Sequence, residues 1–424
     1  MTMKKRTIAM LVLPICLLLV SCETRKTKPV QKNEGKIEIG VHDMYDLETY
    51  MRPLWNDRVV HNETVMFVGM EDEAPLLYKA DEILSVRSYD LQTEYIKGQD
   101  YDYVDGKLLL LPGSTIPCIS KEEYYSNDEK YSMLITEGNV GTDKKYTYWG
   151  EKDTMTKWQV AVTYTHSEFW EGFTPHCYQD RYQDLIRKLE KGENVTFVFY
   201  GDSITYGANA SYIMGIEPKA PSWSQMFTQY VAKKYGYTVT YLTEGKCVAP
   251  VPQEDTVYGE NGVITYINPS VGGWRAEDGY VNVDEHVNNL VDKYGCDLLT
   301  VAFGMNDANL PARNERALVK SVVDKISEHA PNTAIALVAT MVPNPVSTNG
   351  WYGNQYTFEA EFLSLADEYF EAGRECATVC MTSMSQAVLS HKRFRDVTGN
   401  NINHPNDFMG RFYAQMMLET VLGY

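Results

Sequence analysis

The feature that most constrains the fold is a regular alternation of segments after Asp180. Short, continuously apolar runs recur there, and segments of helix length with one apolar face lie between them. Continuously apolar strands are typical of a parallel sheet that helices cover on both faces. The five expected strands are 195–200, 238–243, 297–303, 333–341 and 377–382. The expected helices are at about 222–236, 281–294, 312–329, 358–372 and 407–421.

A different pattern precedes this α/β region. Short β-rich runs such as 64–68, 83–88 and 158–166 recur there between turn signals, and Asp105-Gly106 marks a probable hairpin. This pattern predicts an all-β jelly roll or sandwich. The sequence therefore predicts an all-β domain followed by an α/β domain with a parallel five-stranded sheet.

The N-terminus carries the pattern of an export signal. Lys4-Lys5-Arg6 precede an apolar run from Ile8 to Val20, which is too short to span a bilayer comfortably. The run ends at Leu19-Val20-Ser21-Cys22, which resembles the bacterial lipobox, where cleavage before the cysteine is followed by its lipidation. An ordinary signal peptide or an uncleaved anchor is the alternative.

The lipobox resemblance implies a mature chain that begins at Cys22 and is held in the cell envelope by its lipid. Glu23 follows the cysteine, which favours the outer over the inner membrane in a cell with two membranes and leaves surface exposure open. The next residues are polar and suit a flexible tether. The expected segments are a signal peptide (1–21), a tether (22–36), the β-sandwich domain (37–178) and the α/β domain (179–424).

The chain is strongly acidic, with a formal net charge of −18. Loss of residues 1–21 removes three basic residues and makes the charge −21. Such a chain repels nucleic acid, so no nucleic-acid partner is expected. The six cysteines after Cys22 lack the paired spacing of a metal or redox site, so no metal is expected, and no disulfide pairing is predicted. The sequence has no P-loop and no GxGxxG after a strand, and no cofactor is expected. The sequence leaves the oligomeric state open.

Four short motifs occur in the α/β region, where open sheets bind ligands at the carboxyl ends of their strands. Each is weak alone, because a serine often caps a helix and a double glycine often makes a turn. The motifs are Gly201-Asp202-Ser203, Asn268-Pro269-Ser270-Val271-Gly272-Gly273, Gly304-Met305-Asn306-Asp307 and Asn401-Ile402-Asn403-His404-Pro405. In this order they resemble the four blocks of the SGNH (GDSL) hydrolase family, over roughly residues 195–424.

The resemblance implies a serine esterase with Ser203 as the nucleophile and His404 as the general base. It also implies an oxyanion hole made of the backbone N–H groups of Ser203 and Gly273 and the side-chain amide of Asn306. The residue types suit this chemistry, because a serine hydroxyl needs a base within hydrogen-bond reach and a histidine exchanges protons near neutral pH. Fixed donors stabilise the charge of the tetrahedral intermediate.

One position departs from the family pattern. The family has its acid three residues before the histidine, and this sequence has Asn401 there. Asn401 could orient His404 as a neutral partner, a backbone carbonyl could do so in a Ser-His dyad, or Asp396 or Asp407 could supply a carboxylate. The first two are favoured. Asp202 and Asp307 are expected to brace loops rather than to take part in catalysis.

The substrate is suggested by the order of the domains. A lipoprotein with a β-sandwich before an SGNH domain is similar to bacterial carbohydrate esterases that remove O-acetyl groups, so an acetylated polysaccharide or oligosaccharide is expected. Trp274 could stack on its sugar ring or pack in the core, and residues 244–262 are expected to form a loop, a surface insertion or a substrate contact. The alternatives are a lipase-like or lysophospholipase-like acyl hydrolase and a catalytically inactive glycan-binding lipoprotein.

Overall fold

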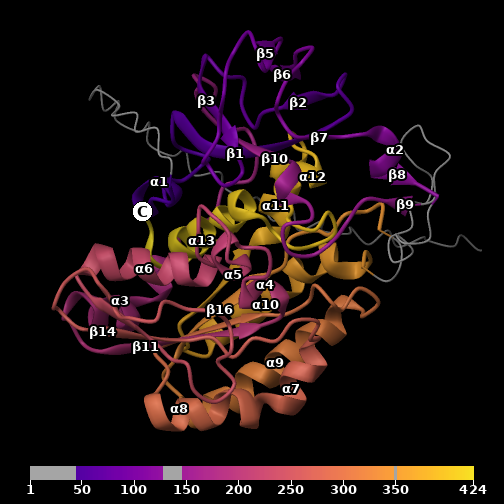
Figure 1. Cartoon of the computed structure of the whole chain (residues 1–424). Coiled ribbons are helices and arrows are strands. Elements are labelled where there is room, and N and C mark those ends of the chain that lie inside the picture. The colour runs from indigo at the N-terminus through magenta and orange to yellow at the C-terminus, as the bar shows by residue number, and fades with distance from the viewer. Residues whose placement is uncertain (1–43, 128–145, 348–350) are drawn as a thin grey trace, which may run out of the picture. The chain divides into compact units, whose positions relative to one another are not determined.

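The computed structural model describes residues 44–127, 146–347 and 351–424 (Figure 1). The predicted signal peptide, the tether and the lipidation site Cys22 lie outside these residues. Among the helices in these three ranges, none combines the length and the hydropathy that a bilayer crossing needs.

The α/β region is built on one sheet in the order β13-β12-β14-β11-β15-β16-β17. Its strands pair in parallel, except that β13 runs antiparallel to β12. The strands are β11 (Val195–Gly201), β12 (Thr238–Tyr241), β13 (Thr256–Val257), β14 (Val263–Ile267), β15 (Leu298–Ala302), β16 (Ala334–Ala339) and β17 (Cys376–Cys380). Because β11, β16 and β17 are buried along their whole length, their sequences are continuously apolar. The predicted α/β fold class is confirmed.

The sheet has two strands more than the five that the sequence predicts. β13 lies inside 244–262, the segment expected to be a loop, and β14 directly follows that segment. A strand of two residues has no readable periodicity, and β14 mixes half-buried with buried positions. β14 pairs with both β12 and β11. The segment that leads from β14 to Gly272-Gly273 therefore starts beside β11, the central strand of the sheet.

Helices cover both faces of this sheet, because the side chains of each strand alternate between two cores. In β11, Phe197 and Phe199 belong to the core on the side of α6 and α13, whereas Val198 and Tyr200 belong to the core on the side of α7, α9 and α10. These helices are α6 (Trp223–Tyr235), α7 (Ala276–Val283), α9 (Ala312–His329), α10 (Phe358–Glu371) and α13 (Asp407–Leu422).

Four of the five predicted helices agree closely with the structure. The helix expected at 281–294 instead begins at Ala276, where Asp278 accepts the Arg275 N–H at 3.0 Å, and continues through a π-helical turn at Asp284–Asn288 into α8 (Asn289–Tyr294). The other helices are short: α1 (Leu47–Tyr50), α2 (Lys121–Tyr124), α3 (Gln183–Glu190), α4 (Ser203–Tyr206), α5 (Ser211–Met214), α11 (Met381–Leu389) and α12 (Phe394–Val397).

The region before residue 179 is rich in β-structure, as predicted. Its main sheet has the order β4-β3-β10-β1-β7, and smaller sheets join β2-β6-β5 and β8-β9. The predicted hairpin connects β5 to β6, with Asp105 at φ 50° and Gly106 at φ 83°. The strands are β1 (Val59–Val68), β2 (Glu73–Pro75), β3 (Glu82–Ser88), β4 (Glu94–Tyr95), β5 (Tyr101–Val104), β6 (Lys107–Leu110), β7 (Cys118–Ile119), β8 (Tyr125–Ser126), β9 (Tyr146–Thr147) and β10 (Gln159–Thr165).

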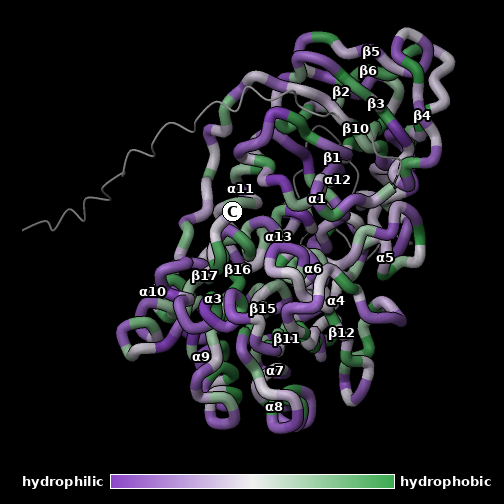
Figure 2. The backbone as a smooth tube through the Cα atoms, turned by 90° about the vertical axis from the view of Figure 1, so that its left-hand side faces the viewer, coloured by the Kyte–Doolittle hydropathy of each residue, from purple (hydrophilic) through white to green (hydrophobic). Residues whose placement is uncertain are grey.

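The β-rich region and the α/β region are in direct contact. Both views of the chain show α13 between β1 and the α/β sheet (Figures 1 and 2). Asp396 of α12 accepts the Met66 N–H at 2.9 Å, and Gln159 donates to the Thr398 carbonyl at 2.8 Å. The loop between α12 and α13 is therefore held against β1 and β10. The described residues all belong to one compact unit. The predicted boundary between a β-sandwich domain and an α/β domain, between residues 178 and 179, therefore stays a prediction.

Candidate active site

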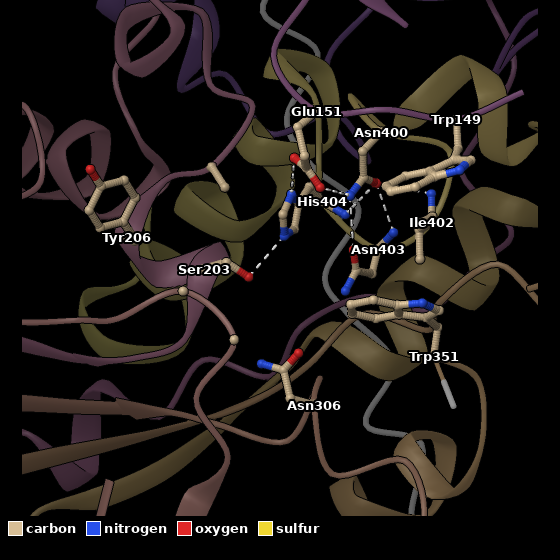
Figure 3. Close-up of a pocket in the computed structure, with 13 residues that line it drawn as sticks. Trp149, Glu151, Ser203, Tyr206, Asn306, Trp351, Asn400, Ile402, Asn403 and His404 are labelled. Atoms are coloured by element: carbon tan, nitrogen blue, oxygen red, sulfur yellow. Dashed lines mark hydrogen bonds and ion pairs between the residues drawn. The ribbon is translucent and has the colours of Figure 1, made fainter. Parts of the chain in front are cut away.

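Ser203 stands at the carboxyl edge of the sheet. It is the first residue of α4, directly after β11, and Asp202 caps this helix by accepting the Ile204 N–H at 2.9 Å. Position 201 requires glycine, because a Cβ there would lie only 2.4 Å from the Ala302 carbonyl oxygen of β15. The close approach of the two strands thus fixes where the serine emerges. The side chain of Ser203 ends in a cavity that His404 and Asn306 also line (Figure 3).

His404 meets Ser203 from the loop between α12 and α13. Its Nε2 lies 2.9 Å from the Ser203 Oγ, and both residues are buried. The loop keeps its shape through Asn400, whose Oδ1 accepts three consecutive backbone N–H groups at 2.9–3.0 Å, those of residues 402–404. Gly399 also donates its N–H to the His404 carbonyl at 2.9 Å. The histidine is therefore held in place by its own loop.

Two acceptors face the other nitrogen of His404. Its Nδ1 lies 2.8 Å from the Asn209 Oδ1 and 3.0 Å from the Glu151 Oε2. Asn209 is oriented by its own Nδ2, which donates to the carbonyls of Lys152 and Gly399 at 2.9 and 3.2 Å. The aligned Glu151, His404 and Ser203 side chains can pass a proton from the serine hydroxyl to the imidazole and can stabilise the resulting positive charge (Figure 3).

Glu151 is ionised in this environment. Burial raises the pKa of its carboxyl, but the hydrogen bond and the charge of His404 lower it more, together with a hydrogen bond from Asn400. The net pKa therefore lies below the ordinary glutamate value. Its side chain is about half exposed, with a relative exposure of 50%, so the carboxylate also keeps contact with solvent.

Sequence reasoning missed both Glu151 and Asn209. Glu151 lies 253 positions before His404 and comes from the β-rich region, so no spacing rule within the four motifs points to it. Asn209 follows the first motif, and its left-handed backbone, with φ 65°, is the local feature that turns its amide toward the histidine. A search for a supporting residue among the sequence neighbours of His404 therefore finds neither Glu151 nor Asn209.

Asn401 does not orient His404, which corrects the prediction for this position. Its Nδ2 donates to the Tyr124 hydroxyl at 2.9 Å and to the Tyr148 carbonyl at 2.7 Å, so the side chain points into the β-rich region. Asp396 and Asp407 do not replace it. Asp396 pairs with Arg393 at 2.8 Å, and Asp407 accepts the Ser211 N–H at 2.8 Å.

The predicted oxyanion donors meet at the same cavity as Ser203. Gly272, Gly273 and Asn306 all line it. A Cβ on Gly272 would lie 3.8 Å from the Ser203 Cβ, and Gly273 has φ 79°, a conformation that favours glycine. Asn306 donates from Nδ2 to the Trp274 carbonyl at 2.8 Å, which fixes the orientation of its amide. The amide nitrogen carries a second N–H, which can serve an oxyanion.

Trp274 itself is not a wall of this cavity, which corrects its assignment as a substrate contact. Its ring packs 4.5 Å from the His286 ring and 6.4 Å from the Tyr200 ring, next to the core under α7 and α9. The tryptophans that line the cavity are Trp149 and Trp351. Trp149 belongs to the β-rich region and Trp351 to the segment before α10, so neither is near a motif in the sequence.

The cavity has a volume of about 510 Å³ and a largely polar and aromatic lining (Figure 3). Among the described residues, two aliphatic side chains, Ala208 and Ile402, line it. The described lining consists of Trp149, Glu151, Ser203, Tyr206, Ala208, Gly272, Gly273, Asn306, Trp351, Asn400, Ile402, Asn403 and His404. Such a lining suits a polar ligand with a short acyl group better than a fatty chain.

Three buried carboxyl groups, two of them in the motif loops, interact through their charges. Burial raises the pKa of Asp202 to about 7 and that of Asp307 to about 6. Burial, with the charges of Asp307 and Asp202, also raises the pKa of Glu315 on α9. Asp202 and Asp307 each accept a backbone N–H, from Ile204 at 2.9 Å and Ala276 at 3.2 Å, and so brace the motif loops.

The described ranges contain no group of histidine, cysteine, aspartate and glutamate side chains that could hold a metal ion. Six cysteines in these ranges are free thiols: Cys118, Cys177, Cys247, Cys296, Cys376 and Cys380. The site as described consists of protein groups arranged for acyl transfer.

Comparisons with known proteins find similarity over the part of the chain that carries Ser203, Gly273 and Asn306. Residues 197–403 match the family model of GDSL-like lipase/acylhydrolase. Part of the chain is similar to a two-domain esterase active on acetylated mannans, co-crystallised with mannopentaose, at 16% identity over 57% of this chain and 53% of that one, with a TM-score of 0.40. The acetylxylan esterase of Geobacillus stearothermophilus is 14% identical over 54% of this chain and 94% of its own, with a TM-score of 0.37.

The match to the two-domain esterase spans only about half of that protein's length, 53%. A comparison with curated proteins finds no match.

Proposed function

We propose that the chain is a carboxylic ester hydrolase that removes O-acetyl groups from polysaccharides through Ser203, His404 and Glu151. The match of residues 197–403 to the GDSL-like lipase/acylhydrolase model supports the ester hydrolase part of this proposal. The observation that carries this proposal is the hydrogen-bonded series from Glu151 through His404 to Ser203, which opens into a cavity with few aliphatic side chains.

The proposed reaction has two acyl-transfer steps. The Ser203 Oγ attacks the acetyl carbonyl carbon while His404 Nε2 takes the hydroxyl proton. The negative charge on the carbonyl oxygen is stabilised by the N–H groups of Ser203 and Gly273 and by the Asn306 amide. The C–O bond to the sugar then breaks, and the sugar oxygen takes the proton from His404. Water, deprotonated by His404, releases acetate from the serine in the same way.

Glu151 and Asn209 divide the support of His404 in this mechanism. Asn209 accepts the Nδ1–H and fixes the tautomer in which Nε2 can act as a base. Glu151 adds the negative charge that stabilises the imidazolium, which an asparagine cannot do. The missing aspartate at position 401 is thus replaced by a carboxylate from another region of the chain.

Assays on three esters test the proposal. We expect the purified protein to hydrolyse p-nitrophenyl acetate and acetylated xylan and to be at least tenfold less active on a long-chain p-nitrophenyl ester. Ser203→Ala abolishes turnover of all of them. A preference for the long-chain ester would instead indicate a lipase-like enzyme. Retained binding of polysaccharide without turnover of any ester would indicate an inactive glycan-binding protein.

We also propose that the mature chain begins at Cys22 and is anchored in the cell envelope by a lipid on that residue. The basic residues, the short apolar run and Ser21-Cys22 support this proposal. Growth with an alkyne-labelled fatty acid should label the wild-type protein and not Cys22→Ser, and the wild type should fractionate with membranes, the outer one in a cell that has two. An unlabelled, soluble wild-type protein would contradict the anchor.

A further inference from the structure

We infer that the side of the cavity bounded by Trp149, Trp351 and Asn403 is a subsite for the sugar ring that carries the ester. This inference rests on the proposed deacetylation. It assigns to the three residues the recognition of the leaving alcohol, a role separate from the acyl chemistry of Ser203 and His404.

The position of the subsite follows from the mechanism. His404 must deliver a proton to the leaving oxygen, so the alcohol part of the ester lies on the His404 side of Ser203. Asn403 directly precedes His404, and Figure 3 shows Trp149 and Trp351 on this same side, with Tyr206 on the opposite side of Ser203. The acetyl carbonyl points to Gly273 and Asn306 instead.

Asn403 offers a hydrogen-bond donor of fixed orientation. The Oδ1 of its neighbour Asn400 is occupied by three backbone N–H groups, so the Asn400 Nδ2 must face the Glu151 Oε1 at 3.1 Å and the Asn403 Oδ1 at 3.0 Å. The Asn403 Oδ1 therefore accepts, and its Nδ2 is the opposite, donating end.

That donor has no hydrogen-bond partner among the residues that the structure describes, although Asn403 is only 2% exposed. Buried polar groups in folded proteins are nearly always paired, and an unpaired one calls for an explanation. Asn403 lines the cavity, and Figure 3 shows its amide nitrogen on the side of Trp351. A sugar hydroxyl next to the ester position would supply the missing acceptor.

The two tryptophans supply the apolar part of the subsite. Both are partly exposed at the cavity although they come from different regions of the chain. Large aromatic side chains next to a few fixed polar groups are typical of ligand sites, and the C–H face of a pyranose ring can pack flat against an indole. Apart from His404, the lining residues that the structure describes offer no basic side chain to a free acid or a phosphate. The chemistry therefore fits a neutral sugar.

The first test compares a sugar ester with an ester that lacks a sugar. Trp351→Ala should lower kcat/KM for an acetylated xylo-oligosaccharide at least tenfold, mainly through KM, and lower kcat/KM for p-nitrophenyl acetate less than threefold. Phe169→Ala, which removes an aromatic ring that is 79% exposed, is the matched control and should change neither value. Equal losses on both esters in Trp351→Ala would overturn the subsite.

The second test removes the donor and its acceptor in turn. An acetylated methyl pyranoside is compared with its analogue lacking the hydroxyl next to the ester, in the wild type and in Asn403→Ala. In the wild type, kcat/KM for the analogue should be at least fivefold lower than for the complete pyranoside. In Asn403→Ala, the two values should differ less than twofold. An equal decrease in kcat/KM in both proteins would show that Asn403 does not bind this hydroxyl.

The wild-type reactions separate failure of the subsite from failure of the proposed function. Turnover of p-nitrophenyl acetate without release of acetate from either sugar substrate would refute the deacetylation and the subsite together. Release of acetate from the sugars with no selective loss in the variants would refute the subsite alone.

Discussion

Two hydrogen-bond acceptors of different charge contact the Nδ1 of His404. They are the neutral Asn209 Oδ1 at 2.8 Å and the carboxylate Oε2 of Glu151 at 3.0 Å. In a Ser-His-Asp triad one aspartate both fixes the tautomer and stabilises the imidazolium, and its replacement by asparagine costs about 10⁴ in turnover. In the proposed mechanism the two tasks fall to two residues, so each can be removed by itself. Their separate contributions can therefore be measured in one protein.

Glu151→Gln should lower kcat on p-nitrophenyl acetate about 10²-fold, less than the roughly 10⁴ seen in the triad template, because Asn209 still fixes the tautomer. KM should change little. Steady-state kinetics on the purified variant measure this, and circular dichroism checks its fold. An unchanged kcat would show that Ser203 and His404 act as a dyad without Glu151.

Glu315 is a buried acid whose titration should be visible in the stability of the protein. It is 0% exposed, and neither carboxyl oxygen has a hydrogen-bond partner in the described part of the chain. Its raised pKa means that the folded state holds this proton to higher pH than the unfolded state, where a glutamate titrates near about 4.3. The resulting stability is full below that pH and is lost as pH rises through the folded pKa.

Glu315→Gln removes this titration while keeping the shape of the side chain. The Tm of the variant should therefore fall less than that of the wild type between pH 4.5 and pH 8, as followed by differential scanning fluorimetry. Glu328→Gln, at an exposed position of the same helix, is the control and should follow the wild-type curve. Parallel curves for Glu315→Gln and the wild type would refute the buried titration.

At the scale of the elements, the connection from α11 to α13 holds His404 against the β-rich region. Lys392, at its start, pairs with Glu63 of β1 at 2.5 Å, and both side chains have 0% exposure. Breaking a buried ion pair from one side leaves the other charge unpaired and typically costs 3–5 kcal/mol. The pair therefore matters for the position of this connection as well as for stability.

Lys392→Met should lower the free energy of unfolding by about 3 kcal/mol or more, because Glu63 stays buried without its cation. Urea titration measures the change. Lys121→Met breaks the exposed pair with Glu71 and should leave the unfolding curve unchanged, as expected for surface ion pairs. A similar curve for all three proteins would mean that the buried pair does not stabilise the fold.

The four motif segments are recognised through their resemblance to a family, and three of them follow strands whose carboxyl ends meet at one edge of the sheet. Ser203 follows β11, Gly273 comes after β14 and Asn306 follows β15, so the geometry of the sheet alone gathers them. Glu151 and Trp149 reach the cavity through tertiary packing of another region, which leaves no periodic trace in the sequence. The sequence of Trp274 and its neighbours is compatible with both a substrate contact and core packing. Its place became clear only from the packing of its ring against His286.

At the scale of the whole molecule, the β-rich region completes the α/β region rather than standing apart from it. Val60 of β1 and Tyr164 of β10 belong to the same hydrophobic core as Phe408 and Leu418 of α13. Removal of the β-rich region would expose this apolar surface to water and remove Glu151 as well. If Glu151 supports His404 as proposed, stability and catalysis both depend on this contact.

A chain limited to residues 179–424 should consequently aggregate, or retain less than about 0.1% of the esterase activity, below the roughly 1% expected of Glu151→Gln in the full chain, because it loses packing in addition to the acid. Size-exclusion chromatography and p-nitrophenyl acetate hydrolysis check both parts, with Ser203→Ala in the full chain as the folded, inactive reference. A monomeric fragment as active as the full chain would show that the acid and the shared core are dispensable, and that the α/β region works alone.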